Sequence, residues 1–209
     1  MPVLVLDTAL EACQAAVVTD GVVCAHVVTR AQGGAEAIAA NAVAALQEAG
    51  VGFGDLARVA VTIGPGSFTG VRVGIAYAKG VAFARSIPAV GVSTLEVLAR
   101  QGGLPALAVI DARHGAVYAA LHTAPGVAPS VAARIPVAAC LELAEAAGAQ
   151  IVGPSGAIQV VGVGTPLQAI DPLVLFECAQ GDPAGRAPRA LYLAPVDAAP
   201  QQHKALARA

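Results

Sequence analysis

The chain opens with three short apolar runs that are rich in β-branched residues and separated by turn residues. The runs cover residues 3–8, 13–20 and 22–30, and Asp20-Gly21 joins the last two. An Asp-Gly pair between apolar runs is a strong signal for a tight hairpin turn. The pattern therefore predicts a three-stranded antiparallel meander.

Helical patterns and apolar strands follow the meander. Residues 35–49 lack glycine and proline, and their alanine background is interrupted by three larger apolar residues, Ile38, Val43 and Leu46. This composition predicts a helix that Gly50 ends. Residues 58–64 are almost entirely apolar after Arg58, which is typical of a strand buried on both faces of a sheet.

The next segment predicts two further helices and a boundary. Residues 71–84 have helical composition, and Ser93 with Glu96 predicts a capping box that begins another helix. The composition then breaks at Gly102-Gly103-Leu104-Pro105. We place a domain boundary there, between residues 103 and 104.

The second half repeats the start of the first. Residues 4–17 and 107–121 both read as an apolar strand ending in an aspartate (Asp7 or Asp111), a turn and a second strand. Internal similarity of this kind predicts two domains of one topology. The fold expected is α/β and duplicated, of the actin-like (RNase H-like) type, with tandem subdomains at 1–103 and 104–197.

The remainder of the second half is less regular. Residues 138–147 predict a helix that Gly148 ends, 150–153 a strand, 160–166 a strand with a glycine turn, and 173–180 a helix. The tail, residues 198–209, is expected to be disordered.

Composition limits the chemistry. The chain has 209 residues, 56% of them hydrophobic and 3% aromatic, so the core is expected to consist of Val, Leu, Ile and Ala. Phosphate binding needs clustered positive charge. With a net charge of -2 and two lysines, the chain lacks the positive charge needed to bind nucleic acid without a partner. Contact with RNA is therefore expected to be indirect, through a partner.

Cysteines, histidines and targeting signals point to no metal site or membrane. The four cysteines, Cys13, Cys24, Cys140 and Cys178, form no C-x-x-C pair, and we interpret them as small buried hydrophobic residues. His26, His114, His122 and His203 are scattered without an H-x-x-x-H pair. No basic leader and no membrane-spanning run are expected, which favours a cytoplasmic protein.

The stretch TIGPGSFTGVRVGIAYAKG, residues 62–80, is the most distinctive segment. A buried strand, a glycine turn and a helix N-terminus can bind an anion, although both the P-loop and the dinucleotide glycine spacings fail. The residues for such anion or nucleotide contact are Asp7, Gly64, Gly66, Ser67, Thr69 and Arg72. The alternative is a structural turn whose Ser67 or Thr69 caps the helix.

Catalytic roles find less support. Ser67 lacks the G-x-S-x-G setting of a nucleophile, so no catalytic residue is assigned. Asp7 and Asp111 end strands where actin-like enzymes place phosphate-positioning acids, but the glycine that normally follows is missing from both. An aspartate that accepts backbone bonds within its own turn is the competing interpretation.

A row of small residues suggests a protein partner. Gly70, Gly74, Ala78 and Ala82 lie four residues apart, and the other faces of the helix are also largely apolar. Small residues let another helix approach closely, so the row is a candidate interface, and an uncovered apolar surface would favour homodimers. An ordinary buried helix within the monomer remains the alternative.

Several segments together resemble a known family. LVLDTALEACQAAV, GPGSFTGVRVGIAYAKGVA, IPAVGVSTLEVLA, VIDARHGAVYAAL and the late YLAP occur in the order and spacing of the bacterial TsaB family, formerly called YeaZ. The resemblance covers residues 1 to about 197. It implies an actin-like fold and a role in placing N6-threonylcarbamoyl on adenosine 37 of tRNAs that read codons beginning with A.

The resemblance also implies partners. TsaB-like proteins are regarded as non-catalytic subunits that pair with a catalytic paralogue, TsaD, while an ATPase, TsaE, resets the complex. The implied interface helices are residues 35–49 and 70–84, with Ile38, Ala42 and Leu46 joining the small row. No cofactor of its own is implied, and ATP or ADP is expected, if anywhere, at the junction with the partner.

Three departures from the family limit this transfer. Residues 30–37 lack a histidine that many relatives carry, Ala194 replaces a late arginine, and the second half is short. The leading hypothesis is a scaffold that activates TsaD. The alternative is a stand-alone actin-like phosphotransferase or ATPase, and a peptidase, which older family names suggest, has no nucleophile or metal site behind it.

Overall fold

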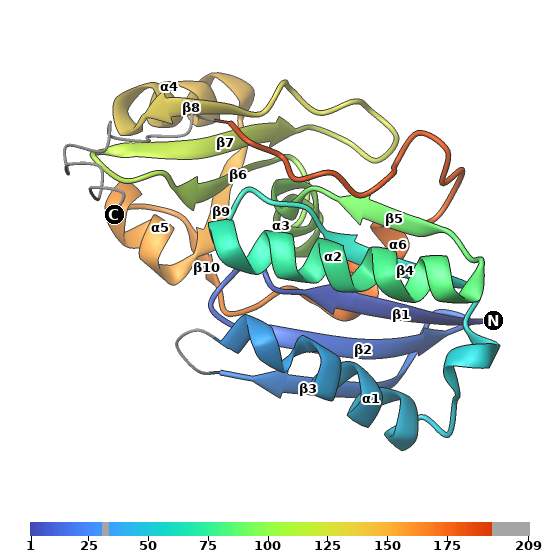
Figure 1. Cartoon of the computed structure of the whole chain (residues 1–209). Coiled ribbons are helices and arrows are strands. Elements are labelled where there is room, and N and C mark those ends of the chain that lie inside the picture. The colour runs from blue at the N-terminus through green and yellow to red at the C-terminus, as the bar shows by residue number, and fades with distance from the viewer. Residues whose placement is uncertain (31–33, 194–209) are drawn as a thin grey trace, which may run out of the picture.

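The computed structural model describes residues 1–30 and 34–193, and two five-stranded sheets form its framework (Figure 1). The first sheet has the order β3-β2-β1-β4-β5, from the strands β1 (Pro2–Asp7), β2 (Cys13–Thr19), β3 (Val22–Thr29), β4 (Arg58–Thr62) and β5 (Ala89–Val92). The second has the order β8-β7-β6-β9-β10, from β6 (Ala106–Asp111), β7 (Ala116–His122), β8 (Ala133–Pro136), β9 (Gln150–Pro154) and β10 (Thr165–Leu167).

The two sheets share one topology, which confirms the predicted duplicated actin-like fold. In each, an antiparallel meander of three strands is followed by two parallel strands. Equivalent positions carry the two aspartates: Asp7 pairs with Gln14 across β1 and β2, and Asp111 pairs with Val117 across β6 and β7.

Two helices of the first half cover one face of the first sheet. They are α1 (Ile38–Glu48), which follows a short 3-10 turn at Gly34–Ala37, and α2 (Phe68–Arg85); a second 3-10 turn lies at Phe53–Asp55. The core beneath them is built from Val, Leu, Ile and Ala side chains such as Leu4, Leu6 and Val61, as the composition predicts. Helix α2 begins three residues earlier than predicted because the Ser67 hydroxyl accepts a hydrogen bond from the Gly70 amide and caps it.

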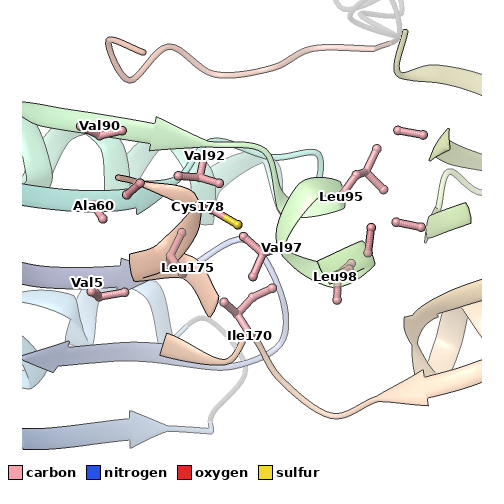
Figure 2. Close-up of a cluster of buried hydrophobic side chains, with 14 of the residues drawn as sticks. Val5, Ala60, Val90, Val92, Leu95, Val97, Leu98, Ile170, Leu175 and Cys178 are labelled. Atoms are coloured by element: carbon pink, nitrogen blue, oxygen red, sulfur yellow. The ribbon is translucent and has the colours of Figure 1, made fainter. Parts of the chain in front are cut away.

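The opposite face of the first sheet packs on a core shared by both halves (Figure 2). Helix α3 (Thr94–Gly102) contacts β6, β7 and β9, whereas α6 (Pro172–Cys178) contacts β1 to β4. Figure 2 shows Ile170, Leu175 and Cys178 lying between the valines of the first sheet and the leucines of α3. The chain beyond residue 170 therefore returns to the first half.

The strands separate cleanly at the predicted boundary, but α6 does not follow them. All strands of the first sheet precede residue 103, and all strands of the second follow it. The backbone beyond α6 also lies along the first half, where the amide of Gly91 donates to the carbonyl of Arg186 at 2.7 Å and that of Leu191 to Ile63 at 2.8 Å. The predicted tail, residues 198–209, falls outside the described residues, as do Ala194, His203 and residues 31–33.

The second half contains one clear error of prediction. Residues 160–166 were expected to form a strand, but α5 (Ser155–Val161) occupies the start of that range and β10 begins only at Thr165. Gly162, at φ +85°, ends the helix in a left-handed conformation that its apolar neighbours gave no reason to expect. Helix α4 (Val137–Ala147) agrees with the prediction and ends at Gly148.

The predicted capping box at the start of α3 is absent. Ser93 occupies the N-cap position without a side-chain cap bond. Glu96 turns away to accept two hydrogen bonds from Arg186, at 3.1 and 3.0 Å. A charged guanidinium is a stronger partner for a carboxylate than one backbone amide, and the sequence hid it because Arg186 lies ninety residues away.

Candidate functional site

The small-residue row of α2 faces the sheet of its own chain. Gly70, Gly74, Ala78 and Ala82 are buried, and so are the three residues of α1 predicted with them, Ile38, Ala42 and Leu46. These seven residues therefore face the core of their own chain. This agrees with the alternative interpretation of α2 as an ordinary buried helix. An interface on α1 and α2 stays a prediction, but it would lie on the opposite side of both helices.

Thr8 explains why two of these positions are glycine. Its hydroxyl donates to the Gly70 carbonyl at 2.7 Å, so the turn after β1 is tied to α2. A Cβ atom at Gly70 would lie 2.0 Å from the Thr8 carbonyl oxygen, and one at Gly74 would lie 2.3 Å from the Thr8 hydroxyl. Only glycine allows this approach.

The outer side of α1 and α2 is the surface available to a partner. We define the outer helix face as the exposed apolar or small residues Ala40 and Val43 of α1 and Ala76, Gly80 and Phe83 of α2. Phe83 is 90% exposed, and Val73 and Tyr77 of the same helix are half-buried. Large aromatic side chains exposed to this degree favour a protein contact.

The glycine turn before α2 is tied to the turn after β1. The amide of Ser67 donates to the carbonyl of Ala9 at 2.7 Å, and a Cβ at Gly66 would lie 2.2 Å from the same oxygen. The Ser67 hydroxyl accepts from Gly70, as described above, so two of the groups expected to meet an anion are used within the chain. Thr69 is exposed.

Asp7 is buried within a polar network and, as the competing interpretation expected, accepts a backbone bond within its own turn. Its carboxylate accepts from the Thr62 hydroxyl at 2.6 Å, the Ala9 amide at 3.0 Å and the Gln14 amide group at 3.3 Å. Gln14 also donates to the Ile170 carbonyl and bonds the His26 ring at 2.9 Å, so the network joins the first sheet to the segment before α6. Burial raises the pKa of Asp7, and the three hydrogen bonds oppose that rise.

Because the pKa of Asp7 is raised in the folded chain, the fold binds this proton more tightly than the unfolded chain does. The contribution of Asp7 to stability is therefore greatest below its unfolded pKa of 3.8 and is lost as the pH rises through the folded pKa. We expect the stability advantage of the native chain over Asp7→Asn to shrink as the pH rises above about 4 in urea titrations. An advantage that grows with pH would contradict the expectation.

A cleft of about 800 Å³ lies between the two halves. The first half contributes Gly64, Gly66 and Ser67, and the second contributes the basic residues Arg113, His114 and Arg134. The aromatic side chains Phe68, Tyr118 and Tyr192 also line it. The structure thus brings three of the six predicted anion-contact residues to one cleft and places Asp7 outside its lining.

Arg72 is bound by aromatic neighbours at the edge of this cleft. Its Nε donates to the Tyr192 hydroxyl at 2.8 Å, and its guanidinium carbon lies 3.5 Å from the centre of the Phe68 ring. Sequence reasoning missed Arg113, His114, Arg134 and the two tyrosines as cleft residues. The one signal in the sequence was position: Arg113 and His114 follow β6, and Tyr192 lies near the chain end.

The four cysteines differ in their exposure. Cys13, Cys140 and Cys178 are buried as predicted, but Cys24 is exposed and the prediction is wrong for it. In the part of the chain that the structure describes, no three His, Cys, Asp or Glu side chains gather where they could hold a metal ion. No helix within residues 1–30 and 34–193 combines the length and apolarity needed to cross a membrane.

Comparison with known proteins relates the chain to two neighbouring families. A family model of TsaD, tRNA N6-adenosine threonylcarbamoyltransferase, matches residues 29–126. The tRNA threonylcarbamoyladenosine biosynthesis protein TsaB of Escherichia coli (strain K12) is 41% identical over 123 residues, which are 56% of this chain and 53% of that protein. The TsaB protein of Bacillus subtilis (strain 168) is 46% identical over 72 residues, 32% of this chain and 31% of that protein.

These sequence matches are partial, since the chain spans about half the length of the first relative that it matches. The structural match is more extensive. The crystal structure of an uncharacterized protein with similarity to peptidase YEAZ from Pseudomonas aeruginosa superposes with a TM-score of 0.76 at 27% identity, over 92% of this chain and 99% of that chain. With the two-sheet topology and the GPGSFTG turn in place, the chain is similar in both sequence and fold to proteins of the TsaB family, also called YeaZ.

Proposed function

We propose that this protein is a non-catalytic subunit of tRNA threonylcarbamoylation, which binds and activates the catalytic paralogue TsaD. The observation that carries the proposal is the outer helix face, where α1 and α2 present apolar and small residues, with Phe83 90% exposed, on the side away from their own sheet. Two helices packed side by side on a sheet offer a partner's helix pair a ready groove.

The comparisons support this choice of partner. The model that matches residues 29–126 is that of TsaD, and the matched range includes α1 and α2. A chain that shares its fold with TsaD can pair with it through equivalent helices, much as two identical subunits pair about a twofold axis. By the same argument, the chain forms homodimers through this face when TsaD is absent.

The remaining partners follow from the pathway that the relatives' name gives. We propose that TsaE binds the complex of this chain with TsaD. We also propose that tRNA is contacted mainly by TsaD, because the net charge of this chain is -2. The product is threonylcarbamoyladenosine at position 37 of tRNAs that read codons beginning with A. Any ATP or ADP of this reaction is bound at the junction with TsaD.

A drop-out reconstitution tests the proposal. The threonylcarbamoyl-adenylate synthase, TsaD and TsaE are incubated with tRNA, threonine, bicarbonate and ATP, and threonylcarbamoyladenosine is measured by mass spectrometry with and without this chain. We expect product only when the chain is present. Equal product in its absence, or no complex with TsaD in size-exclusion chromatography, would overturn the proposal.

A further inference from the structure

The duplicated fold leaves one helix of the second half with little cover. In each half a helix follows the three-stranded meander, α1 in the first half and α4 in the second, and each of the two has 11 residues. Helix α1 buries Ile38, Asn41, Ala42, Ala45 and Leu46, whereas α4 buries only Cys140 and Ala144. Since every residue of α4 except its two glutamates is apolar, much of its apolar surface faces solvent.

The length of the neighbouring helix accounts for this difference. In the first half, α1 packs beside α2, which has 18 residues, whereas the equivalent neighbour of α4 is α5, which has 7. The helical layer of the second half is therefore the smaller one, and it leaves Leu141 38% and Leu143 37% exposed on α4. Exposed apolar side chains grouped on one helix favour a further contact.

The exposed side of α4 is also acidic. Glu142 and Glu145 are exposed, and neither forms a salt bridge with a described residue. Residues 135–170 contain no lysine, arginine or histidine, so no residue nearby in sequence balances these carboxylates. The α4 helix of a second copy is a poor cover for this surface, because two acidic surfaces repel each other.

The chain beyond Leu193 has the complementary composition. Residues 198–209 include His203, Lys204 and Arg208 and no aspartate or glutamate, and Leu206 is their one large apolar residue. A polar segment of this kind cannot bury enough apolar area to order itself, which is the physical basis of the disorder expected from the sequence. A surface of opposite charge and with exposed leucines removes that obstacle, because such segments fold on binding.

The described chain ends near α4. Leu193, its last residue, lines the same cleft as Arg134 of β8, and β8 leads directly into α4 (Figure 1). Residues 194–209 span up to about 55 Å when fully extended, whereas the eleven residues of α4 extend over about 16 Å. The segment can therefore reach the whole of α4 without any change in the described fold.

We propose that residues 194–209 dock on α4 of their own chain, with Lys204 and Arg208 facing Glu142 and Glu145 and with Leu206 against the exposed leucines. Because the segment is tethered, its effective concentration at α4 is about millimolar, and weak contacts suffice to hold it. Exposed ion pairs are contacts of this modest strength. The docking involves the second half alone, so it is independent of the proposed pairing with TsaD through α1 and α2.

Cleavage by thermolysin, which cuts before leucine, tests the docking in the full chain. The rate of cutting before Leu206 is followed by intact-mass spectrometry and divided by the rate for a synthetic peptide of residues 194–209 with the same sequence. We expect the native chain to be cut at least about fivefold more slowly than its peptide, because a docked segment is withheld from the protease. Equal rates would overturn the proposal.

Charge reversal on either side identifies the docking surface. Glu142→Lys with Glu145→Lys is expected to remove the protection, and so is Lys204→Glu with Arg208→Glu, because each pair of substitutions turns attraction into repulsion. The four substitutions together should restore protection to within about twofold of the native value, since the charges are opposite again. The tail variants leave every described residue unchanged, so unfolding of α4 cannot explain their effect.

The matched control is Glu36→Lys with Glu48→Lys, which adds the same charges in and beside α1, the equivalent helix of the first half. We expect it to change protection less than about twofold at moderate salt, because α1 is remote from the docking surface. Protection should also stay constant over about a hundredfold range of protein concentration, as tethered docking requires. Protection that rises with concentration would show binding to a second copy, and protection unaffected by reversal at Glu142 and Glu145 would place the segment elsewhere; either result overturns the proposal.

Discussion

Replacing Gly70 with alanine is expected to lower the free energy of unfolding by about 3 kcal/mol, which is about 6 to 12 °C in melting temperature for a chain of this size. The added Cβ would lie 2.0 Å from the carbonyl oxygen of Thr8, a backbone atom that cannot rotate away. The turn after β1 must therefore move, and the Thr8 hydroxyl bond to Gly70 is strained with it. Urea unfolding followed by circular dichroism measures the loss.

Gly80 provides the matched control on the same helix. It is exposed, and a Cβ there would meet no atom within 4 Å. Gly80→Ala is expected to stabilise the chain by about 0.5 to 1 kcal/mol, because alanine is the better helix former. If both variants changed stability by similar amounts, the close approach of Thr8 to α2 would be wrong.

Replacing Ala76 with arginine is expected to weaken the complex with TsaD by at least about 100-fold, because a charge would be buried at the centre of an apolar interface. Ala76 is exposed on the outer side of α2, and arginine is nearly as good a helix former as alanine, so the chain should stay folded. Titration calorimetry with purified TsaD gives the change in affinity, and the reconstituted reaction should lose product in parallel.

The control for this variant is Ala146→Arg, at an exposed alanine of α4 in the second half. It adds the same charge to a helix far from the outer helix face, and we expect it to leave affinity for TsaD within about twofold. Unchanged affinity in Ala76→Arg would move the interface elsewhere. A large loss of melting temperature in that variant would instead show that α2 is covered within the chain.

Local patterns predicted most of the elements and the duplication. The Asp-Gly hairpin, the glycine that ends α4 and the matching strands around Asp7 and Asp111 each depend on neighbours in sequence. Predictions from such signals hold in the folded chain because the backbone preferences of a few residues largely determine turns and helix ends.

The direction in which a helix face points was harder to predict than the presence of the helix. Periodicity placed Gly70, Gly74, Ala78 and Ala82 on one face of α2, but it could not say whether that face meets the sheet or a partner. When a helix is apolar nearly all round, more than one of its sides could face the core. The answer came from Thr8, sixty-two residues from Gly70, which fits against α2 only where the side chains are smallest.

Contacts between distant segments were beyond local patterns altogether. The bond of Glu96 to Arg186 replaced the expected capping box, and Arg113 and Arg134 became neighbours only when β6, β7 and β8 paired. The candidate site was therefore half predicted: the glycine turn was found, and the basic and aromatic residues that face it were not.

The return of α6 to the first sheet sets an order of events during synthesis. Residues 1–92 contain every strand of that sheet, yet one of its apolar faces is covered by Ile170, Leu175 and Cys178. A nascent chain that has emerged only as far as β5 therefore carries an incomplete core, with Val5, Ala60 and Val90 lacking this cover. That face of the sheet stays uncovered until nearly the whole chain has left the ribosome, and until then its valines are the surface that a chaperone would meet.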